Sequence, residues 1–450
     1  MSPAFAPHIL FGLNPMWVSL AVLAVTYAFI IAGRFNHAVV ALIGAAVLIL
    51  IGALDQNEAI KGIDWNTIGL LTGMMILVSI SRRSGLFQFL AIASAQRVKA
   101  NPAGILLMLQ LATAILSAVL NNVSTVLLIV PVTLVIAEEL ELPPFPFLFA
   151  EVFASNVGGT ATLIGDPPNI LIGSQTGLGF NAFLANVAPV AVVIMAVQAV
   201  LVHFLWGRSL RASPESRVLV MGMNAPGMVT DWVLLRRSVV VMGAVLAAFI
   251  LAGPLHLQPA TIALTGAAAL MLLDNLKHRG PKQADNVRTT FADIEWTTIF
   301  FFIGLFVVVH AVEMSGLLAL VGGKLVTLTG GNLATAGALI LWVSAVLSAI
   351  LDNIPFVAAM IPLIKSAAPA FGASGHVDPK QIEPLWWCLS LGACLGGNGT
   401  LTGASANLAV AGIAERNGIR FSFVQYLRYG APMTFISIVI CQLYVWLRYF

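Results

Sequence analysis

The stretch ILSAVLNNVSTVLLIVP, residues 115–131, returns along the chain as VLSAILDNIPFVAAMIP, residues 346–362, at an offset of 231 residues. A second pair follows at an offset of 238 residues: GGTATLIGDPPN at 158–169 and GGNGTLTGASAN at 396–407. Two long matches at nearly the same spacing indicate a duplicated structural unit. The chain is therefore predicted to contain two copies of one helical arrangement.

The composition of the chain indicates a helical membrane protein. Hydrophobic residues make up 59% of its 450 residues and charged residues only 9%, whereas soluble domains carry about 25% charged residues. Apolar runs of about 20 residues, the length that crosses a bilayer as a helix, recur along the sequence. The alternating pattern of a membrane barrel is absent. We therefore expect an all-α polytopic membrane protein in the lipid bilayer of the cell membrane, specifically the bacterial cytoplasmic membrane.

Several motifs that would point to other functions are absent. The N-terminal stretch MSPAFAPHILFGLNPMW lacks the features of a signal peptide, so the first span is expected to be retained. The cysteines Cys388, Cys394 and Cys441 form no metal-binding or disulfide pattern. The sequence contains no GxxxxGK, HExxH or GxSxG motif and no basic, aromatic patch. No enzymatic activity, cofactor, metal site or nucleic-acid partner is expected.

About ten transmembrane helices and two re-entrant hairpins account for the apolar segments. Hairpins are expected at 103–137 and 333–365, because Asn121–Asn122 and Asp352–Asn353 stand at their centres, and irregular backbone at membrane depth must line a cavity or be buried in protein. The alternative is that each segment crosses the membrane twice, which leaves every later span in the same orientation. The expected spans lie near 17–33, 38–54, 65–81, 147–172, 184–206, 238–253, 260–275, 296–312, 386–412 and 430–447.

The distribution of basic residues orients these spans. With both termini outside, all but five of the 22 Lys and Arg residues fall in segments predicted to be cytoplasmic, as the positive-inside rule requires. The exceptions are Lys61, Lys324, Lys365, Lys380 and Arg448. The span that begins at Trp65 then runs inward, and its repeat mate, which begins at Trp296, runs outward. The two repeats are predicted to have inverted topologies.

Within this topology, the chain divides into four segments. Residues 1–60 are expected to form N-terminal scaffold helices, and 207–295 a cytoplasmic loop with linking scaffold helices. Repeat 1 is expected at 61–206 and repeat 2 at 296–450. Each repeat contains one of the hairpins and one discontinuous helix, at 147–172 in the first repeat and at 386–412 in the second.

A substrate site is predicted where the two hairpin tips and the two broken helices converge. Inverted-repeat transporters place half-helix ends and unwound carbonyl groups around a site at the membrane midplane. Pro167 and Pro168 break the first helix, and four glycines between 396 and 403 loosen its partner. The predicted substrate or ion-binding residues are Asn121, Asn122, Ser124, Thr125, Gly159, Thr160, Thr162, Asp166, Asn169, Asp352, Asn353, Asn398, Thr400, Thr402, Ser405 and Asn407.

Two acids in this set are the candidates for proton coupling. Asp352 is expected to carry the proton, because its repeat mate Asn121 performs the same capping task as a neutral amide. Asp166 precedes two prolines, which is the pattern of a helix N-cap, so a structural role is expected for it. A cap aimed at a cavity can also bind a ligand, and the two interpretations are compatible.

These motifs resemble those of the ion transporter superfamily. The NN and DN hairpin tips and the stretch NVGGTATLIGDPPNI resemble the branch that holds ArsB-type arsenite permeases and the melanosomal P protein. The resemblance implies a scaffold domain and a mobile transport domain. It also implies one of three activities: sodium-coupled dicarboxylate transport, sodium/proton exchange, or export of arsenite and antimonite. Well-known bacterial arsenite permeases lack the GDPPN segment.

The favoured function is a secondary active transporter that exports arsenite or antimonite in exchange for protons. Arsenite is a small uncharged hydroxide near neutral pH, so it needs hydroxyl, amide and carbonyl partners. The predicted site offers these groups and contains no Lys or Arg. The partners expected are this small inorganic substrate and a coupling proton or sodium ion; a homodimer and an accessory ATPase subunit are left open.

The alternatives are a sodium/proton antiporter, a sodium-coupled carrier of organic or inorganic anions, and a channel. Two Asp residues and many glycine carbonyls suit hard cations, which take oxygen ligands. An intramembrane enzyme is disfavoured, because no nucleophile–base pair or metal cluster is present in the sequence.

Overall fold

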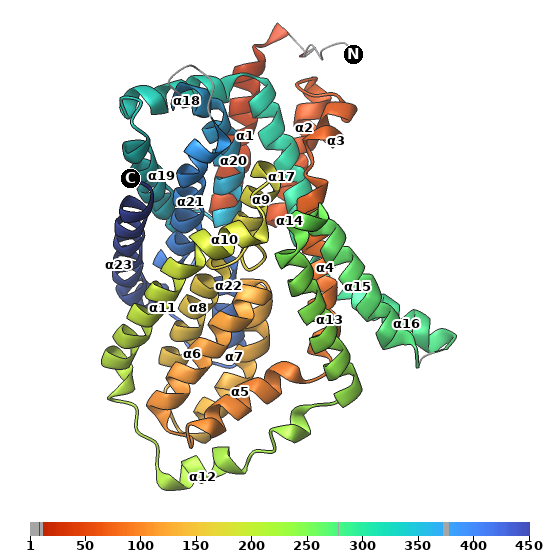
Figure 1. Cartoon of the computed structure of the whole chain (residues 1–450), viewed down its shortest axis with the longest axis vertical. Coiled ribbons are helices and arrows are strands. Elements are labelled where there is room, and N and C mark those ends of the chain that lie inside the picture. The colour runs from red at the N-terminus through yellow and green to blue at the C-terminus, as the bar shows by residue number, and fades with distance from the viewer. Residues whose placement is uncertain (1–8, 10–11, 278, 372–377) are drawn as a thin grey trace.

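The computed structural model describes residues 9, 12–277, 279–371 and 378–450, and in these residues the chain forms helices and no strands (Figure 1). The expected N-terminal segment 1–60 therefore lies partly outside the described residues. By length and composition, nine helices of the described part could each cross a membrane, and ten could do so if α3 and α4, bent by 56° at their junction, are one span. This confirms the predicted all-α membrane fold, and four of the nine helices are the arms of the two predicted hairpins.

The first half of the chain contains a hairpin followed by a broken helix. The hairpin is α6–α7, and α8–α9 is interrupted between Thr160 and Pro167. The helices of this half are α1 (Pro15–Ala32), α2 (His37–Ile51), α3 (Gln56–Gly62), α4 (Trp65–Arg82), α5 (Leu86–Arg97), α6 (Pro102–Val119), α7 (Asn122–Glu139), α8 (Phe145–Thr160), α9 (Pro167–Thr176), α10 (Phe180–Asn186), α11 (Ala188–Val202) and the π-helix η2 (His203–Gly207).

The second half repeats this order. The hairpin is α19–α20, and the broken helix is α21–η5–α22. The helices of this half are α12 (Pro214–Gly222), η3 (Pro226–Met228), α13 (Trp232–Ile250), α14 (Ala252–Leu255), α15 (Pro259–Asn275), α16 (Pro281–Ala292), α17 (Trp296–Met314), α18 (Leu317–Leu328), α19 (Leu333–Ile350), α20 (Asn353–Ala367), η4 (Ala368–Phe371), α21 (Pro379–Gly396), η5 (Gly397–Gly399), α22 (Ser405–Arg416) and α23 (Phe423–Tyr449).

The two halves run in opposite directions. Figure 1 shows α5 at one end of the molecule, with α6 and α7 rising from it, and α18 at the opposite end, from which α19 and α20 descend. The hairpins therefore enter from opposite ends and meet between them. Gly85 and Gly316 stand at the matched turns before α5 and α18, with φ angles of 81° and 79°, a conformation that glycine adopts without strain. The predicted inverted repeats are confirmed.

Glycines allow close packing of helices from different halves. Helix α4 packs on α15, and α17 packs on α2 in the equivalent way. A Cβ atom on Gly73 would lie 2.6 Å from the backbone of Ala263, and one on Gly304 would lie 2.6 Å from that of Ala41. Since even one methyl group does not fit, these contacts hold the backbones together. Each half of the chain therefore packs closely on the other at two symmetric helix crossings.

Glycines also allow each hairpin to pack closely on the broken helix of its own repeat. Helix α6 packs on α8, and α19 packs on α21. A Cβ atom on Gly158 would meet the carbonyl oxygen of Ala114 at 2.1 Å, and one on Gly396 would meet that of Ala345 at 2.5 Å. This packing brings the hairpin tips against the helix breaks.

Candidate functional site

The carboxylate of Asp166 lies between the tips of the two hairpins. Asn122 and Asn353 are the first residues of α7 and α20, and each side-chain amide donates to the same oxygen, Oδ1 of Asp166, at 3.3 Å. Asp166 is completely buried. Its second oxygen, Oδ2, has no hydrogen-bond partner among the described residues. One carboxylate oxygen is therefore held by both repeats, and the other is free to accept a hydrogen bond or a proton.

The two prolines explain why this carboxylate does not cap its own helix. A capping side chain accepts hydrogen bonds from the N–H groups of the first helical turn. Pro167 and Pro168 have no N–H, and Asn169 donates its N–H to the main-chain oxygen of Asp166 at 3.0 Å. The side chain makes no capping bond. The expected capping role of the Asp166 side chain is therefore wrong, and the prolines leave the carboxylate available to the hairpin tips.

Asn156 of α8 links the two broken helices beneath this carboxylate. Its Nδ2 donates to Oδ1 of Asn398 at 2.8 Å and to Oδ1 of Asn407 at 2.9 Å. Its own oxygen accepts a hydrogen bond from Asn122 at 3.1 Å. Asn156 was not among the predicted residues, although it is a polar residue half a turn before Gly158–Gly159 that corresponds to Cys394 in the other repeat.

Two equivalent asparagines stabilise the helix breaks themselves. Asn169 donates from Nδ2 to the carbonyl oxygens of Thr160 and Thr162, both at 2.9 Å. Asn407 donates in the same way to the carbonyls of Gly397 and Thr400, at 2.8 and 2.9 Å. The last carbonyls of a helix have no partner inside it. These amides satisfy such carbonyls where α8 and η5 end, so their NH₂ groups are already occupied.

A small cavity of about 70 Å³ opens at the hairpin tips. Four predicted residues in addition to Asp166 line it: Asn121, Asn122, Asn353 and Ser405. Glu295 and Thr298 also line it and were not predicted. No Lys or Arg is among its lining residues. The cavity therefore offers amides, hydroxyls and carboxylates, and no positive charge.

Asp352 faces a larger, adjoining cavity of about 430 Å³, which the turn between α1 and α2 and the start of α17 also line. Its side chain accepts a hydrogen bond from the Ser405 hydroxyl at 2.9 Å and caps α20 through the N–H of Ile354 at 3.5 Å. Thr298, Ile354 and Ser405 line both cavities. Asp352 is therefore near the tip cavity and outside its lining.

The remaining predicted residues support the site or lie beside it. The Thr125 and Thr160 hydroxyls donate to carbonyls of their own helices. The Thr162 and Thr400 hydroxyls tie the breaks to Ala118 and Ala349, at the ends of the entering hairpin helices. The other three are placed as follows: Gly159 packs on Gly165, Ser124 lines a separate cavity, and Thr402 is exposed.

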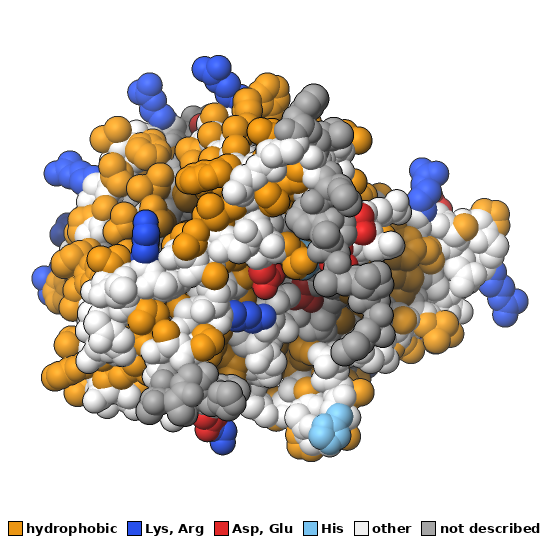
Figure 2. All heavy atoms as spheres, turned by 90° about the horizontal axis from the view of Figure 1, so that it is seen from above, with side chains coloured by type: hydrophobic (Ala, Val, Ile, Leu, Met, Phe, Trp, Pro, Cys, Tyr) orange, Lys and Arg blue, Asp and Glu red, His pale blue; other side chains and the backbone are white. Residues whose placement is uncertain are grey.

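At the α3 and α18 end of the molecule, side chains bridge the start of α4 to α9. Asp64, which precedes α4, accepts hydrogen bonds from the Ser174 hydroxyl at 2.8 Å and the Gln175 amide at 3.0 Å. Asn66 donates to Ser174 at 2.9 Å. Figure 2 shows this end, where acidic side chains gather near the middle of a face that is otherwise largely apolar or uncharged. These bonds fasten α9 to the start of α4 at this end.

Comparison with known proteins places these features in a family. The family described as "Citrate transporter" matches residues 27–392. An uncharacterised transporter of Mycobacterium tuberculosis is 42% identical over 96% of this chain and 99% of its own length. The human P protein is 32% identical over 95% of this chain and 59% of its own length.

Two solved structures share the fold at low sequence identity. The YdaH transporter of Alcanivorax borkumensis has a TM-score of 0.58 at 13% identity, covering 96% of this chain and 98% of its own. MtrF of Neisseria gonorrhoeae has a TM-score of 0.57 at 12% identity, covering 97% of this chain and 95% of its own. At such identity the likeness concerns the fold alone.

Proposed function

The chain belongs to the citrate transporter family of the ion transporter superfamily, and from this premise we propose that it is a secondary active transporter that exports arsenite or antimonite in exchange for protons. The resemblance of the sequence to the branch of arsenite permeases and P protein supports the substrate class. The chemistry of the tip cavity supports it independently.

The observation that carries the proposal is the uncharged, hydrogen-bonding character of the tip cavity around one free carboxylate oxygen. Its volume of about 70 Å³ has room for a molecule of a few heavy atoms. Arsenite and antimonite are neutral trihydroxides near neutral pH, and they donate and accept hydrogen bonds. A site without Lys or Arg suits them better than a multiply charged carboxylate such as citrate, whose burial requires positive partners.

The free oxygen of Asp166 provides a simple basis for exchange. As a carboxylate, Oδ2 accepts a hydrogen bond from a hydroxyl group of the substrate. When Oδ2 binds a proton, it becomes a hydrogen-bond donor, and the bond that it accepted from the substrate hydroxyl is broken. Substrate and proton therefore exclude one another at this atom, and mutual exclusion at a single alternating site is the requirement for antiport.

Sodium/proton exchange is the second candidate, and the acids of the cavity favour it. Asp166 and Glu295 line the same small space together with amide and hydroxyl oxygens. Hard cations prefer oxygen ligands, and a sodium ion at Oδ2 of Asp166 would compete with a proton in the same way as arsenite.

Transport by purified protein in liposomes separates these candidates. The lumen is made acidic, and uptake of arsenite, antimonite, radioactive sodium and citrate is measured in parallel, with Asp166→Asn as control. We expect arsenite and antimonite to accumulate in the wild type and not in Asp166→Asn. Accumulation of sodium alone would favour the second candidate, and accumulation of citrate alone would contradict both.

A further inference from the structure

Glu295 and Asp64 occupy equivalent positions in the two repeats, directly before Trp296 and Trp65, but their side chains do different things. Asp64 caps α4 by accepting the N–H groups of Asn66 and Thr67 at 3.1 Å. The Glu295 side chain makes no capping bond, and among the described residues its carboxylate accepts a hydrogen bond only from the Thr298 hydroxyl, at 3.3 Å. Because the Glu295 side chain does not cap α17, its carboxylate is available to bind a proton or a ligand.

The Glu295 side chain lies between two cavities. It lines the 70 Å³ tip cavity with Asp166, Asn122 and Asn353. It also lines a second cavity of about 60 Å³ with Arg82, Ser124 and Asp293. Met75 is the other residue common to both linings, so Glu295 is the titratable group that the two cavities share.

The second cavity leads to a solvent-accessible ion pair at the α5 end of the molecule. Arg82 donates to Asp293 at 2.9 Å, and their side chains are 47% and 26% exposed. Ser79 donates to the same oxygen of Asp293 at 2.8 Å. Arg82 forms its ion pair with Asp293 and not with Glu295. The Glu295 carboxylate is therefore not held in its charged form by a direct ion pair with Arg82, and it can bind and release a proton.

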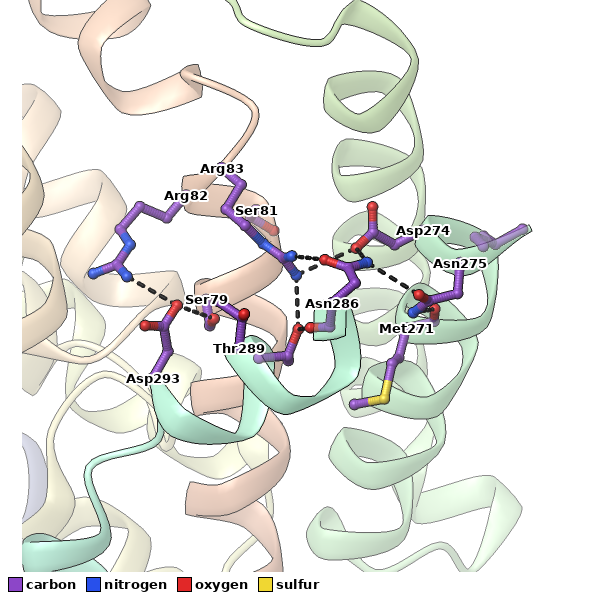
Figure 3. A network of polar contacts seen from close by, with 12 residues as sticks. Ser79, Ser81, Arg82, Arg83, Met271, Asp274, Asn275, Asn286, Thr289 and Asp293 are labelled. Atoms are coloured by element: carbon purple, nitrogen blue, oxygen red, sulfur yellow. Dashed lines mark hydrogen bonds and ion pairs between the residues drawn. The ribbon is translucent and has the colours of Figure 1, made fainter. Parts of the chain in front are cut away.

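A network beside this ion pair anchors α16, the helix that precedes Glu295 in the chain. Figure 3 shows Arg83 of α4 in contact with Asp274 of α15 and Asn286 of α16, while Asp293 faces Arg82. Arg83 also donates to Thr290 at 2.8 Å. Helix α16 is therefore anchored to α4 and α15, and Arg82 of α4 also holds Asp293, which lies between α16 and Glu295.

We propose that Glu295 carries protons between the tip cavity and the solvent at the Arg82–Asp293 ion pair. A proton from solvent binds the Glu295 carboxylate on the side of the second cavity. It then passes to Oδ2 of Asp166, directly or through one water, and Glu295 returns to its carboxylate form. The charged or titratable groups that face this path are Asp166, Arg82, Asp293 and the Cys394 thiol of α21 beside Asp166, with Asp352 beyond Ser405 and Thr298. This inference deepens the proposed function and rests on proton exchange at Asp166.

The test compares Glu295→Gln and Glu295→Asp with the wild type in proteoliposomes, with Glu215→Gln in the exposed part of α12 as matched control. Two rates are measured, first with arsenite and then with sodium. The first rate is counterflow at equal pH on both sides of the membrane. The second is uptake driven by an acidic lumen, at external pH values from about 5.5 to about 8.5. We expect Glu295→Gln to keep counterflow but to lose gradient-driven uptake by about tenfold or more. Glu295→Asp should recover part of this loss with a displaced pH profile.

Three outcomes would overturn the inference. The first is that Glu295→Gln keeps the gradient-driven rate and the pH profile of a wild type that exchanges solute for protons. Equal loss of counterflow in Glu295→Gln and Glu295→Asp would assign the residue a structural role. If the wild type exchanges neither arsenite nor sodium for protons, the proposed function itself is refuted, and this inference with it.

Discussion

Asn156 donates from Nδ2 to Oδ1 of Asn407 at 2.9 Å, and this bond joins the broken helix of the first repeat to that of the second. Both residues are completely buried. The same amide of Asn156 also reaches Asn398, so one side chain connects α8 with both parts of the second break. The two discontinuous helices are thus fastened to each other directly beneath the carboxylate that the hairpin tips hold.

Asn156→Ala should therefore lower both stability and transport. It leaves the buried Oδ1 atoms of Asn398 and Asn407 without this donor, which costs about 1–3 kcal/mol. We expect a lower unfolding temperature in detergent and a strong loss of arsenite counterflow. Asn417→Ala, which removes an exposed hydrogen bond at the end of α22, is the matched control. Behaviour of Asn156→Ala identical to that of the control would contradict the importance of this connection.

Asp166→Asn and Asp352→Asn should differ in proton coupling. The structure changes the expectation drawn from the sequence, because Asp352 is the residue whose side chain caps a helix, and Asp166 has the free oxygen. Asparagine is also a good N-cap, so Asp352→Asn should retain most gradient-driven transport. Asp166→Asn cannot bind a proton at this atom and should lose the response to a pH gradient. Initial rates against lumenal pH measure this, and the reverse result would return the coupling role to Asp352.

The bridge from Asp64 to α9 should bias the protein toward the conformation described here. Replacing both Ser174 and Gln175 by Ala removes both of its bonds and the bond from Asn66 to Ser174, and the equilibrium should shift toward a state open at the α3 end. A cysteine at Ala358, which lines a cavity of about 60 Å³ at that end, should then react faster with an impermeant maleimide in a cysteine-free background. Asp55→Asn, at a cap on the same end without a bond to α9, is the control. An unchanged rate would show that the bridge is not limiting.

Glycine substitutions test the close packing of the hairpins. Gly158→Ala places a methyl group 2.1 Å from the carbonyl oxygen of Ala114, so we expect a loss of about 1–3 kcal/mol in unfolding free energy. Gly412→Ala, within α22, has open space around the new methyl group. It should be neutral or stabilising by up to about 1 kcal/mol. Thermal unfolding of the two variants in the same detergent gives the comparison, and equal melting temperatures would contradict the packing argument.

Cysteine labelling tests the orientation in the membrane. Lys61, Lys380 and Arg211 are exposed in the structure. From the positive-inside rule, Lys61→Cys and Lys380→Cys should react with an impermeant reagent in intact cells, and Arg211→Cys should react only after the membrane is opened. The opposite pattern would reverse the orientation without altering the inverted relation of the repeats.

The sequence was sufficient for the fold because its repeat and its apolar runs are long-range patterns. The expected spans coincide with the helices within a few residues at most ends, and both hairpins reverse where the paired polar residues stand. Gly85 and Gly316 and the breaks at 160–167 and 396–405 follow from local backbone preferences, which single residues reveal.

The site was harder to predict because it depends on where side chains point. Asn156 and Glu295 lie on helices or caps with no unusual sequence, and only the packing of α8 against η5 and of α17 against the hairpin tips brings them to the site. Asp166 was identified as a residue but assigned a cap, although the two prolines that follow it lack the N–H groups that a capping side chain binds. Thr402 was included by its repeat position, although its side chain faces outward.

A single carboxylate lies between two symmetric amides, and this bears on how such a chain came to be. Asp166 corresponds to Ala404 in the second repeat, while Asn122 and Asn353 correspond to each other. If two identical half-length subunits formed this structure, the acid would be present at both positions or at neither, and two buried acids at one axis would repel each other. Joining the halves in one gene removes that constraint. After fusion, one copy could keep the acid and the other could lose it, so two repeats of equal fold could carry different charges at the same site.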